Sequence, residues 1–396
     1  MKTLTGLAIG ALGALTVTFG TAPGAGAQDF DWPRLMVIAT PGTSTGSFAS
    51  TNGWAPVLQK ETGTTVRVVP EDSELKRYLR LTDDKNVAVA SISAAEMRFQ
   101  LQGIGAYASA KPGAMRLLWH HNDTPWGYVV AGNSKIQSMD DLKAGGVRIS
   151  QSVASPAMTL SVKTSLPAYL GMSPEEAEKM FEYVPASSYG ASCRAVTEGK
   201  ADIAYCAPIS SVLSEMEGSP GGIRWIDMPV SNKEGWEGYL ASRPMLAPGP
   251  ITLGVETARG VGGLTSNFVY TVSADADEDF AYNMAKWLDQ SYDNYKSSHA
   301  LAARMSRELF RSYLNVTPLP VHEGVVRYLR EAGVWTDEDD VWNAEAVALM
   351  DRWVAAREAA FAEAREKGVK IDAQNPDFLA IVETHTAGLP QFRSRL

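Results

Sequence analysis

The sequence predicts an α/β protein made of two lobes and a helical C-terminal extension. Segments with strand and helix patterns alternate from Arg34 onward, which is typical of a mainly parallel sheet covered by helices. The alternation restarts after Ala131, and apolar segments beyond Ile251 then return to the first lobe. A chain that leaves a lobe and comes back crosses twice, so we expect a two-strand hinge on which the lobes can close.

The first part of lobe 1 is expected at 28–131. Its first strand, 34–40, leads through a loop rich in Gly, Ser and Thr into an amphipathic helix at 48–61, which Gly63 ends. The elements that follow are strand 64–69, helix 74–81, strand 87–92, strand 116–120 and strand 126–131. The polar sequence 121–125 predicts a turn between the last two strands.

Lobe 2 is expected at 132–250, and 251–335 completes lobe 1. The elements expected in lobe 2 are a short helix from Ser138, strand 146–150, loop 151–156, helix 157–170, strand 181–184, helix 188–199 and strand 202–206. The returning elements are strand 251–255, strand 267–273 and helix 278–294.

The C-terminal extension, 336–396, contains two predicted helices, 340–366 and 372–384. A lid, a brace across the back of both lobes and a dimer surface are all compatible with such helices. We favour the brace, because a helix of mixed charge that carries Trp342, Trp353 and Phe361 usually buries one stripe against its own protein.

Residues 1–27 have the pattern of a cleaved signal peptide. Lys2 is followed by an apolar run, 4–19, and then by the small residues Ala25, Gly26 and Ala27. The run is short for a membrane span, and neither a basic cluster nor a cysteine for lipid attachment follows it. No other stretch is long and apolar enough to cross a bilayer, so we expect an exported chain without direct membrane insertion.

The charge pattern excludes two classes of partner. The formal net charge at pH 7 is −9, and the basic residues are scattered along the chain. Nucleic acids and anionic membranes bind clustered Lys and Arg, so we expect neither as a partner.

The chain has two cysteines, Cys193 and Cys206. An oxidising compartment permits a disulfide between them. Cys193 is expected in the first turns of a helix and Cys206 at the end of the next strand, which puts both at the same edge of the sheet. The alternative is a pair of small buried thiols.

Two strand–loop–helix units, at 40–47 and 150–155, offer hydroxyl groups and free backbone N–H groups at a helix N-terminus. Such a helix end binds a carboxylate or phosphate without a buried fixed charge. For either loop alone, helix capping by Ser and Thr is the simpler interpretation. Recurrence in both lobes favours the hypothesis of two anion sites that face one cleft.

No motif for catalysis, cofactor binding or metal binding stands out. The sequence has no Gly-x-Ser-x-Gly elbow, no His-Glu-x-x-His helix and no nucleotide-binding glycine loop. His120 and His121 are adjacent on a predicted strand and therefore point to opposite faces, which disfavours a shared metal ion. We expect a binding protein that is not an enzyme and has no cofactor and no metal.

Three segments carry a resemblance to a known family. Residues 35–40 with 42–48 resemble the opening of the TAXI family, the solute receptors of TRAP transporters. Residues 138–150 are similar to that family's entry into lobe 2, and 195–205 to its later helix–strand unit. The similarity covers about 34–335 and leaves out the long C-terminal helix.

The resemblance implies a type II periplasmic binding protein with Venus flytrap closure, a periplasmic location and a TRAP-type membrane permease as partner. Its ligand would be a small organic acid or amino acid, such as glutamate or a related dicarboxylate. The ligand-binding positions that it implies are Thr43, Ser44, Thr45, Phe48, Ser152, Ser155, Tyr205 and Pro208. Phe48 stands where the family usually has tyrosine. The alternative function is a periplasmic sensor or scaffold component that is not coupled to transport.

Charged residues near the expected cleft bear on the ligand. The sequence 71–73, Glu-Asp-Ser, replaces a region that is usually rich in Thr and Ser in the family. Its two carboxylates disfavour a ligand with dense negative charge, or pair with an ammonium group, so an amino acid fits. Arg148 and Arg194 are the best cations for a bidentate contact to a carboxylate. Trp126 either covers an apolar face of the ligand or packs in the core.

Overall fold

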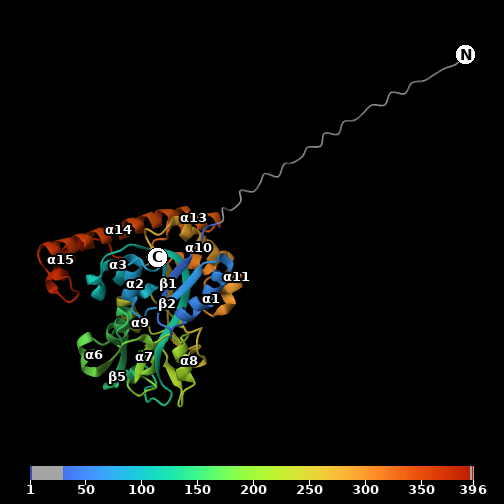
Figure 1. The fold of residues 1–396 in the computed structure, drawn as a ribbon. Helices are drawn as coiled ribbons and strands as arrows, with labels where there is room; N and C mark the ends of the chain where they lie inside the picture. Colours follow the sequence, from blue (N-terminus) through green and yellow to red (C-terminus); the bar gives the residue numbers. More distant parts are fainter. Residues whose placement is uncertain (2–29, 393–394, 396) are drawn as a thin grey trace. The chain divides into compact units, whose positions relative to one another are not determined.

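The computed structural model describes residue 1, residues 30–392 and residue 395. The expected signal peptide therefore lies, apart from Met1, outside the described residues. Every element below belongs to the compact unit Trp32–Leu396 (Figure 1). No helix in the described part of the chain has both the length and the apolar character that a membrane crossing requires.

Lobe 1 is built on a sheet with the strand order β2-β1-β3-β10-β4. Its strands are β1 (Leu35–Thr40), β2 (Thr65–Pro70), β3 (Val89–Ser93), β4 (Met115–Ala131) and β10 (Gly262–Ser273). The first three are parallel, and β10 is antiparallel to β3 and β4. The helices that follow the three parallel strands are α1 (Gly46–Thr62), α2 (Glu74–Thr82) and α3 (Ala94–Gln102). The strand and helix alternation predicted for this part of the chain is confirmed.

Local chemistry explains where α1 begins and ends. The side chain of Thr45 accepts a hydrogen bond from the backbone N–H of Phe48, which caps the N-terminus. Gly63 takes a left-handed conformation with φ of 76°, and its N–H bonds to the carbonyl of Gln59 at the C-terminus. The helix therefore starts directly after β1 and points its N-terminus at the cleft.

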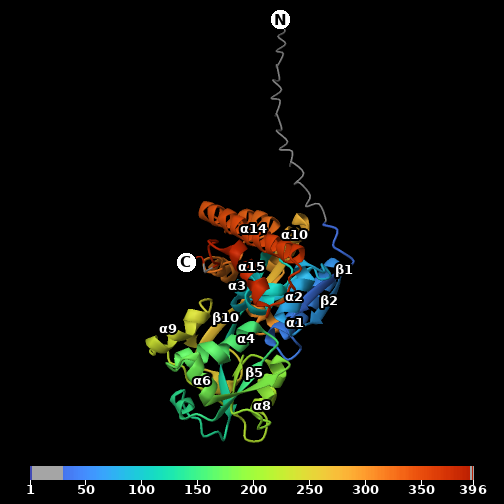
Figure 2. The ribbon, with the colours of Figure 1, turned by 90° about the vertical axis from the view of Figure 1, so that its left-hand side faces the viewer.

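Lobe 2 continues the sheet in the order β4-β7-β5-β6, with β8 paired to β4. Its strands are β5 (Val147–Ser152), β6 (Phe181–Ala186), β7 (Ile203–Cys206) and β8 (Ile223–Ile226). Its α-helices are α4 (Pro156–Leu160), α5 (Leu166–Tyr169), α6 (Pro174–Met180), α7 (Tyr189–Arg194), α8 (Ser211–Glu217) and α9 (Lys233–Ser242). Figure 2 shows these green and yellow elements grouped together, away from α1, α2 and α14.

One helix expected in lobe 2 is confirmed and one is shorter than predicted. The helix predicted at 157–170 is continuous from Pro156 to Tyr169, with a π turn, Ser161–Ser165, between α4 and α5. Pro167, beside this turn, has no N–H to donate. The helix expected at 188–199 ends as α7 at Arg194, and turns lead to Gly199, which has φ of 69°.

The turn predicted at 121–125 is wrong, because β4 is one strand of 17 residues. Residues in this region pair with β10, with Asn122 opposite Phe268 and Trp126 opposite Leu264. The polar side chains that suggested a turn instead bond to lobe 1. Asn122 Nδ2 donates to Ser47 Oγ over 3.3 Å, and Arg304 Nε donates to Asp123 Oδ1 over 2.7 Å.

The strand predicted at 251–255 is also wrong. The strand in this region is β9 (Ala247–Pro250), which pairs with β10. After it the chain turns tightly: the N–H of Gly260 donates to the carbonyl of Ile251 over 2.9 Å, and Gly254 has φ of 110°. The strand predicted at 267–273 is confirmed as the later part of β10.

Two hydrophobic cores divide along the long strands. On β4 the core of lobe 1 includes Trp119 and that of lobe 2 includes Trp126. On β10, Phe268 belongs to lobe 2 and Val269 to lobe 1. The change of lobe thus lies in the middle of both strands, whereas the sequence put the crossings near Ala131 and Ile251. We propose that the middle of β4 and β10 is the hinge.

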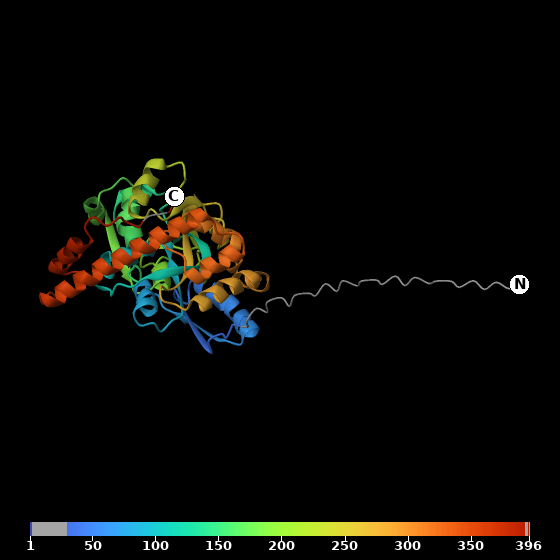
Figure 3. The same cartoon turned by 90° about the horizontal axis from the view of Figure 1, so that it is seen from above.

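The rest of lobe 1 and the extension are helical. The helices are α10 (Glu278–Gln290), α11 (Tyr292–Tyr295), α12 (Arg307–Leu314), α13 (Glu323–Glu331), α14 (Asp337–Glu366) and α15 (Pro376–Thr386). Figure 3 shows α14, in orange, running across the molecule. Met350 and Trp353 on α14 are buried in the core of lobe 1. The segment after α15 extends to lobe 2, since Phe392 lines a small pocket together with Met245 and Leu246 of the lobe 2 segment.

A disulfide joins Cys193 on α7 to Cys206 at the end of β7, with 6.1 Å between the Cα atoms. We expect denatured, unreduced protein to have no thiol that reacts with a colorimetric reagent, and reduced protein to have two. Closing a loop of this size stabilises a fold by about 2–4 kcal/mol, so reduction is expected to lower the melting temperature. The Cys193→Ser variant is the control and is expected to release one thiol. Two thiols without reductant would contradict the pairing.

Candidate functional site

A cleft lies between the two lobes, at the carboxyl ends of their parallel strands. Residues that follow β1 and β2, and the last residue of β3, line it from lobe 1, and residues that follow β5, β6 and β7 line it from lobe 2. The strands β4 and β10 form its floor with Thr124, Trp126, Ser266 and Phe268. It holds about 670 Å³ outside the protein atoms, part of it open to solvent. Ligands of open α/β sheets bind at such carboxyl ends.

The structure brings three of the eight expected ligand-binding residues, Thr45, Ser155 and Tyr205, to the cleft. The other five, Thr43, Ser44, Phe48, Ser152 and Pro208, are not on its lining.

Contacts explain the places of these five. Thr43 is exposed, and Phe48 is half-buried within α1. The carbonyl of Ser44 accepts a hydrogen bond from Ser211 Oγ of lobe 2 over 3.3 Å, and that of Pro208 accepts from the Val255 N–H over 3.0 Å. The hydroxyl of Ser152 is buried without a hydrogen-bond partner in the described part of the chain.

In the first loop, the hydroxyl group of Thr45 mainly caps the N-terminus of α1. Thr45 Oγ1 donates to the carbonyl of Gly42 over 2.8 Å and accepts from the N–H of Phe48 over 3.2 Å. Both bonds stay within the loop and the first turn of α1. The capping interpretation therefore describes Thr45 even though the residue also lines the cleft.

The second loop already holds a carboxyl group, which comes from the chain itself. Glu96, on α3 of lobe 1, accepts hydrogen bonds through Oε1 from Ser155 Oγ and, over 2.8 Å, from the N–H of Ala157. Its Oε2 accepts from the hydroxyl of Tyr107 over 3.2 Å. The contacts with Ser155 and Ala157 join the two lobes directly. The backbone donor that the sequence offered to a ligand is thus occupied by a buried carboxylate, which is 1% exposed.

Replacing Glu96 tests this lobe-to-lobe contact. Hydrogen bonds to a charged group are worth about 1.5–3 kcal/mol each, so Glu96→Ala is expected to shift the ratio of closed to open ligand-free protein by about tenfold or more. Small-angle scattering would detect the larger radius of gyration. The control is Glu96→Gln, which keeps an acceptor oxygen and is expected to stay closer to wild type. Equal radii for all three proteins would contradict the role of the contact.

Burial raises the pKa of Glu96, and the hydrogen bonds from Ser155 and Ala157 offset part of that effect. Opening the lobes hydrates the carboxyl and returns its pKa towards the ordinary 4.5. At pH values between 4.5 and the raised pKa of the closed form, the closed form therefore binds more protons than the open form. Consequently, closure is favoured as the pH falls through this window.

One charged pair in the cleft is self-contained. Arg77, on α2, forms an ion pair with Glu74 and donates from Nε to the carbonyl of Ser91 over 3.0 Å and from Nη1 to the carbonyl of Glu71. Glu74 Oε1 in turn accepts from the N–H of Ser93 over 2.7 Å. Each charge is neutralised by the other, so this pair offers no net charge to a ligand.

Arg243, which follows α9, is a second cation in the cleft and was not identified from the sequence. It is only 6% exposed and donates to the hydroxyls of Ser161 and Tyr205. Its guanidinium carbon lies 5.6 Å from the centre of the Tyr205 ring. Among the described residues its Nε has no hydrogen-bond partner. It forms no direct ion pair there, although the buried carboxyl of Glu96 interacts with it electrostatically. No local motif marks this residue, because the fold alone brings it to the cleft.

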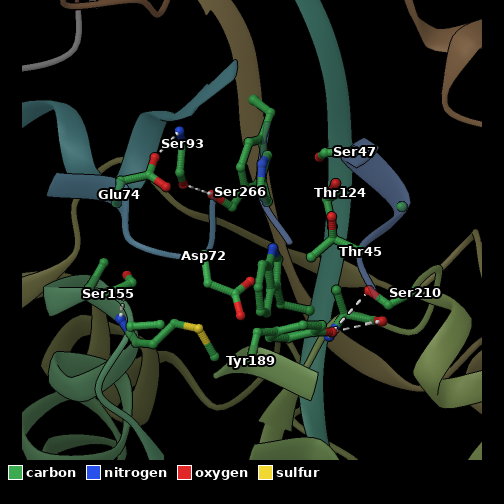
Figure 4. Close-up of a pocket in the computed structure, with 18 of the residues that line it drawn as sticks. Thr45, Ser47, Asp72, Glu74, Ser93, Thr124, Ser155, Tyr189, Ser210 and Ser266 are labelled. Carbon is green, nitrogen blue, oxygen red and sulfur yellow. Dashed lines mark hydrogen bonds between the residues drawn. The ribbon is translucent and has the colours of Figure 1, made fainter. Parts of the chain in front are cut away.

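Asp72 is the carboxylate that the sequence placed near the cleft, and it lines the pocket. Figure 4 shows its side chain extending into the pocket, with Tyr189 beyond it. Its carboxylate makes no hydrogen bond or ion pair within residues 30–392. A Cβ at Gly42 would lie 1.9 Å from Asp72 Oδ1, so the glycine of the first loop leaves room for this carboxylate.

One side of the cleft is aromatic. The Trp126 ring stacks on Tyr205 with 4.9 Å between centroids and meets the edge of Tyr189 at 5.8 Å. Burial raises the pKa of Tyr189 to about 12, so its hydroxyl remains neutral, and it bonds to Ser210 Oγ over 2.9 Å. Trp126 is 9% exposed. It therefore packs in the core of lobe 2 and also presents a surface to the cleft.

The other candidates from the sequence lie elsewhere. Arg148 pairs with Asp202 over 2.7 Å and Arg194 with Glu215 over 3.3 Å, and neither arginine lines the cleft. His120 bonds to Asn267 and to the carbonyl of Arg304, whereas His121 bonds to Ser91 and Tyr270 on the other face of β4. Among the described residues no group of three His, Cys, Asp or Glu could hold a metal ion.

In comparisons with known proteins, one family model and several solved structures of similar fold match this chain. The model of the NMT1-like family matches residues 38–333. No curated protein matches the sequence.

Three solved structures illustrate the similar folds. PhnD1 from Prochlorococcus marinus in complex with methylphosphonate is 10% identical, with 77% of this chain and 100% of that chain covered and a TM-score of 0.44. An ancestral arginine-binding protein bound to glutamine is 11% identical, with 69% and 97% covered and a TM-score of 0.40. The periplasmic aliphatic sulphonate binding protein SsuA from Escherichia coli is 13% identical, with 80% and 89% covered and a TM-score of 0.37. Similarities this weak support no conclusion about the ligand.

Proposed function

The chain belongs to the NMT1-like family, and on this premise we propose that it is a periplasmic solute-binding protein. It captures a small organic acid or amino acid between its lobes and delivers the ligand to a membrane permease. It performs no chemistry on the ligand and uses no cofactor.

The observation that carries this proposal is the composition of the cleft. Its walls come from two lobes with separate cores, and only the strands β4 and β10 form its floor. A ligand that contacts both walls stabilises the closed form over the open form by its extra contacts there. A permease that recognises the closed form then receives mainly loaded protein.

The type of permease rests on the sequence resemblance. The segments 35–48, 138–150 and 195–205 resemble the TAXI family. They include Ser44 and Thr45 of the first loop and Tyr205 of the cleft. This resemblance supports a TRAP-type permease as the partner.

A ligand screen tests the proposed function. Purified mature protein is mixed with organic acids and amino acids, and its melting temperature is measured. A true ligand at one hundred times its dissociation constant stabilises the fold by about 2.7 kcal/mol. Each stabilising compound is then tested by small-angle scattering for a smaller radius of gyration. If no compound of these classes both stabilises and compacts the protein, the proposal is wrong.

One feature supports the alternative, a sensor or scaffold component. The extension, 336–396, lies outside the family match and carries exposed apolar side chains, with Val341 63% and Leu379 39% exposed. A photo-reactive group at Leu379 in cells distinguishes the two functions. Cross-links to a histidine kinase favour sensing, and their absence together with cross-links from the cleft rim to a permease favours transport.

A further inference from the structure

We infer that the cleft selects a zwitterion with one negative group, one ammonium group and an apolar body, and that it rejects dicarboxylates. Arg243 binds the negative group and Asp72 the ammonium group. This inference rests on the proposed function and names the ligand class of the same site. It departs from the glutamate or dicarboxylate ligand that the sequence resemblance implies.

Arg243 is built to receive an anion. A guanidinium at 6% exposure has lost most of its hydration, and a buried charge needs a partner of opposite sign. Within the described residues it donates to the neutral hydroxyls of Ser161 and Tyr205, and its Nε has no hydrogen-bond partner. Glu96 interacts with it electrostatically without a direct ion pair. A ligand carboxylate supplies a negative group in direct contact and fits the planar donor group of arginine.

Asp72 supplies the opposite charge in the same cleft. Its carboxylate is half-buried and makes no hydrogen bond or direct ion pair within the described residues, although it interacts electrostatically with Arg77. Gly42 leaves it space, since any Cβ there would displace the carboxylate. An ammonium group of the ligand satisfies it, whereas a second ligand carboxylate near it is repelled.

The charge balance excludes a second anion. Four charged residues line the cleft, namely Asp72, Glu74, Arg77 and Arg243. Glu74 and Arg77 form an ion pair, so Arg243 and Asp72 are the lining charges without a direct ion pair in the described residues. Glu96, behind the lining, adds negative charge when ionised. A dicarboxylate would therefore bury a second negative charge without a cation beside it, which weakens its binding.

The remaining lining points to an apolar body on the ligand. Trp126, Tyr189, Tyr205, Phe268 and Met158 all contribute to it. The stacked rings of Trp126 and Tyr205 offer a flat surface. An aromatic or branched amino-acid side chain gains free energy by covering this surface, and a second polar head group does not.

Calorimetry with five probes tests the inference on the mature, full-length protein. L-Phenylalanine and L-leucine carry both charges, 3-phenylpropanoate lacks the ammonium group, and L-glutamate and succinate carry an additional or second carboxylate. We expect at least one of the first two to bind, and 3-phenylpropanoate, glutamate and succinate to bind about tenfold more weakly or worse than it.

Asp72→Asn separates the two ends of the ligand. We expect it to weaken binding of the amino acid by about tenfold, because the ammonium group contacts Asp72. The affinity for 3-phenylpropanoate, which has no ammonium group, is expected to be unchanged or higher. Glu215→Gln, at the surface pair with Arg194, is the matched control and is expected to behave as wild type.

The outcomes distinguish the two proposals. If glutamate or succinate binds more tightly than phenylalanine and leucine, the inference is wrong but the solute-binding function stands. Equal affinity for phenylalanine and 3-phenylpropanoate overturns the role of Asp72 and with it the zwitterion. If neither these probes nor the wider screen gives a ligand, the proposed function itself fails.

Discussion

Arg243→Ala is expected to lower the affinity for an anionic or zwitterionic ligand by about thirtyfold or more. Removing one partner of a buried, hydrogen-bonded charge pair costs about 2–5 kcal/mol, and each 1.4 kcal/mol is about tenfold in affinity. Arg243 is the cation of the cleft that forms no direct ion pair with a carboxylate in the described residues. Calorimetry with the best ligand of the screen measures the loss.

Two further variants make the Arg243 result specific. Arg243→Lys keeps the charge but loses the planar donor group, so we expect an intermediate affinity. Arg194→Ala removes an arginine that pairs with Glu215 away from the cleft, and its affinity is expected to match wild type. Melting temperatures show whether each variant folds, because Arg243 also contacts Ser161 and Tyr205. Wild-type affinity in folded Arg243→Ala would contradict our account of the cleft.

Arg357→Ala is expected to destabilise the fold by about 3–5 kcal/mol. Arg357, on α14, is 1% exposed and donates to the carbonyls of Gln100, Tyr107 and Ala110 over 3.2, 2.7 and 2.8 Å. Alanine leaves these three buried carbonyls without their donor and creates a cavity. Urea denaturation, followed by circular dichroism, measures the free energy of unfolding.

The matched control for Arg357 lies on the same helix. Arg352 is exposed, and Arg352→Ala is expected to change the free energy of unfolding by no more than about 0.5 kcal/mol. A similar small effect of Arg357→Ala would show that α14 is not anchored through this residue. Gly103, which follows α3, independently indicates that Arg357 packs closely against this segment. Its φ is 66°, and a Cβ there would lie 2.5 Å from Arg357 Nε.

The anchor of α14 connects the extension to the cleft. Arg357 binds the carbonyl of Gln100 near the end of α3, and Glu96 near the start of α3 contacts Ser155 of lobe 2. The tail adds a second contact, since Arg98 of α3 donates to Gln391 over 2.7 Å. We propose that the extension braces α3 and thereby the contact between the lobes. The brace favoured from the sequence remains a proposal in this more specific form.

Much of the fold followed from local patterns. Strands such as β1 and β3 are short apolar runs, and Gly63 and Thr45 set the ends of α1 through backbone conformation and capping. The turn at 121–125 failed because a polar sequence with a proline also occurs in a strand whose side chains bond to neighbours. Asn122 and Asp123 find partners in Ser47 and Arg304, which are distant in sequence.

The site was only partly predictable, because several of its residues come together only through contacts between segments that are distant in sequence. The loops after β1 and β5 were identified because strand ends of an α/β sheet face the ligand side, and Thr45 and Ser155 lie there. Arg243 comes from the end of a helix far along the chain, and no spacing relates it to these loops. Glu96 belongs to a helix as well, and only the folded structure brings it to Ser155.

The most direct test of the central claim is a crystal structure of the mature protein with the tightest ligand from the screen. Our account predicts that the ligand lies between the lobes above β4 and β10, with its negative group on Arg243 and its ammonium group on Asp72. A ligand bound outside this cleft, or bound in it without contact to either residue, would contradict the account.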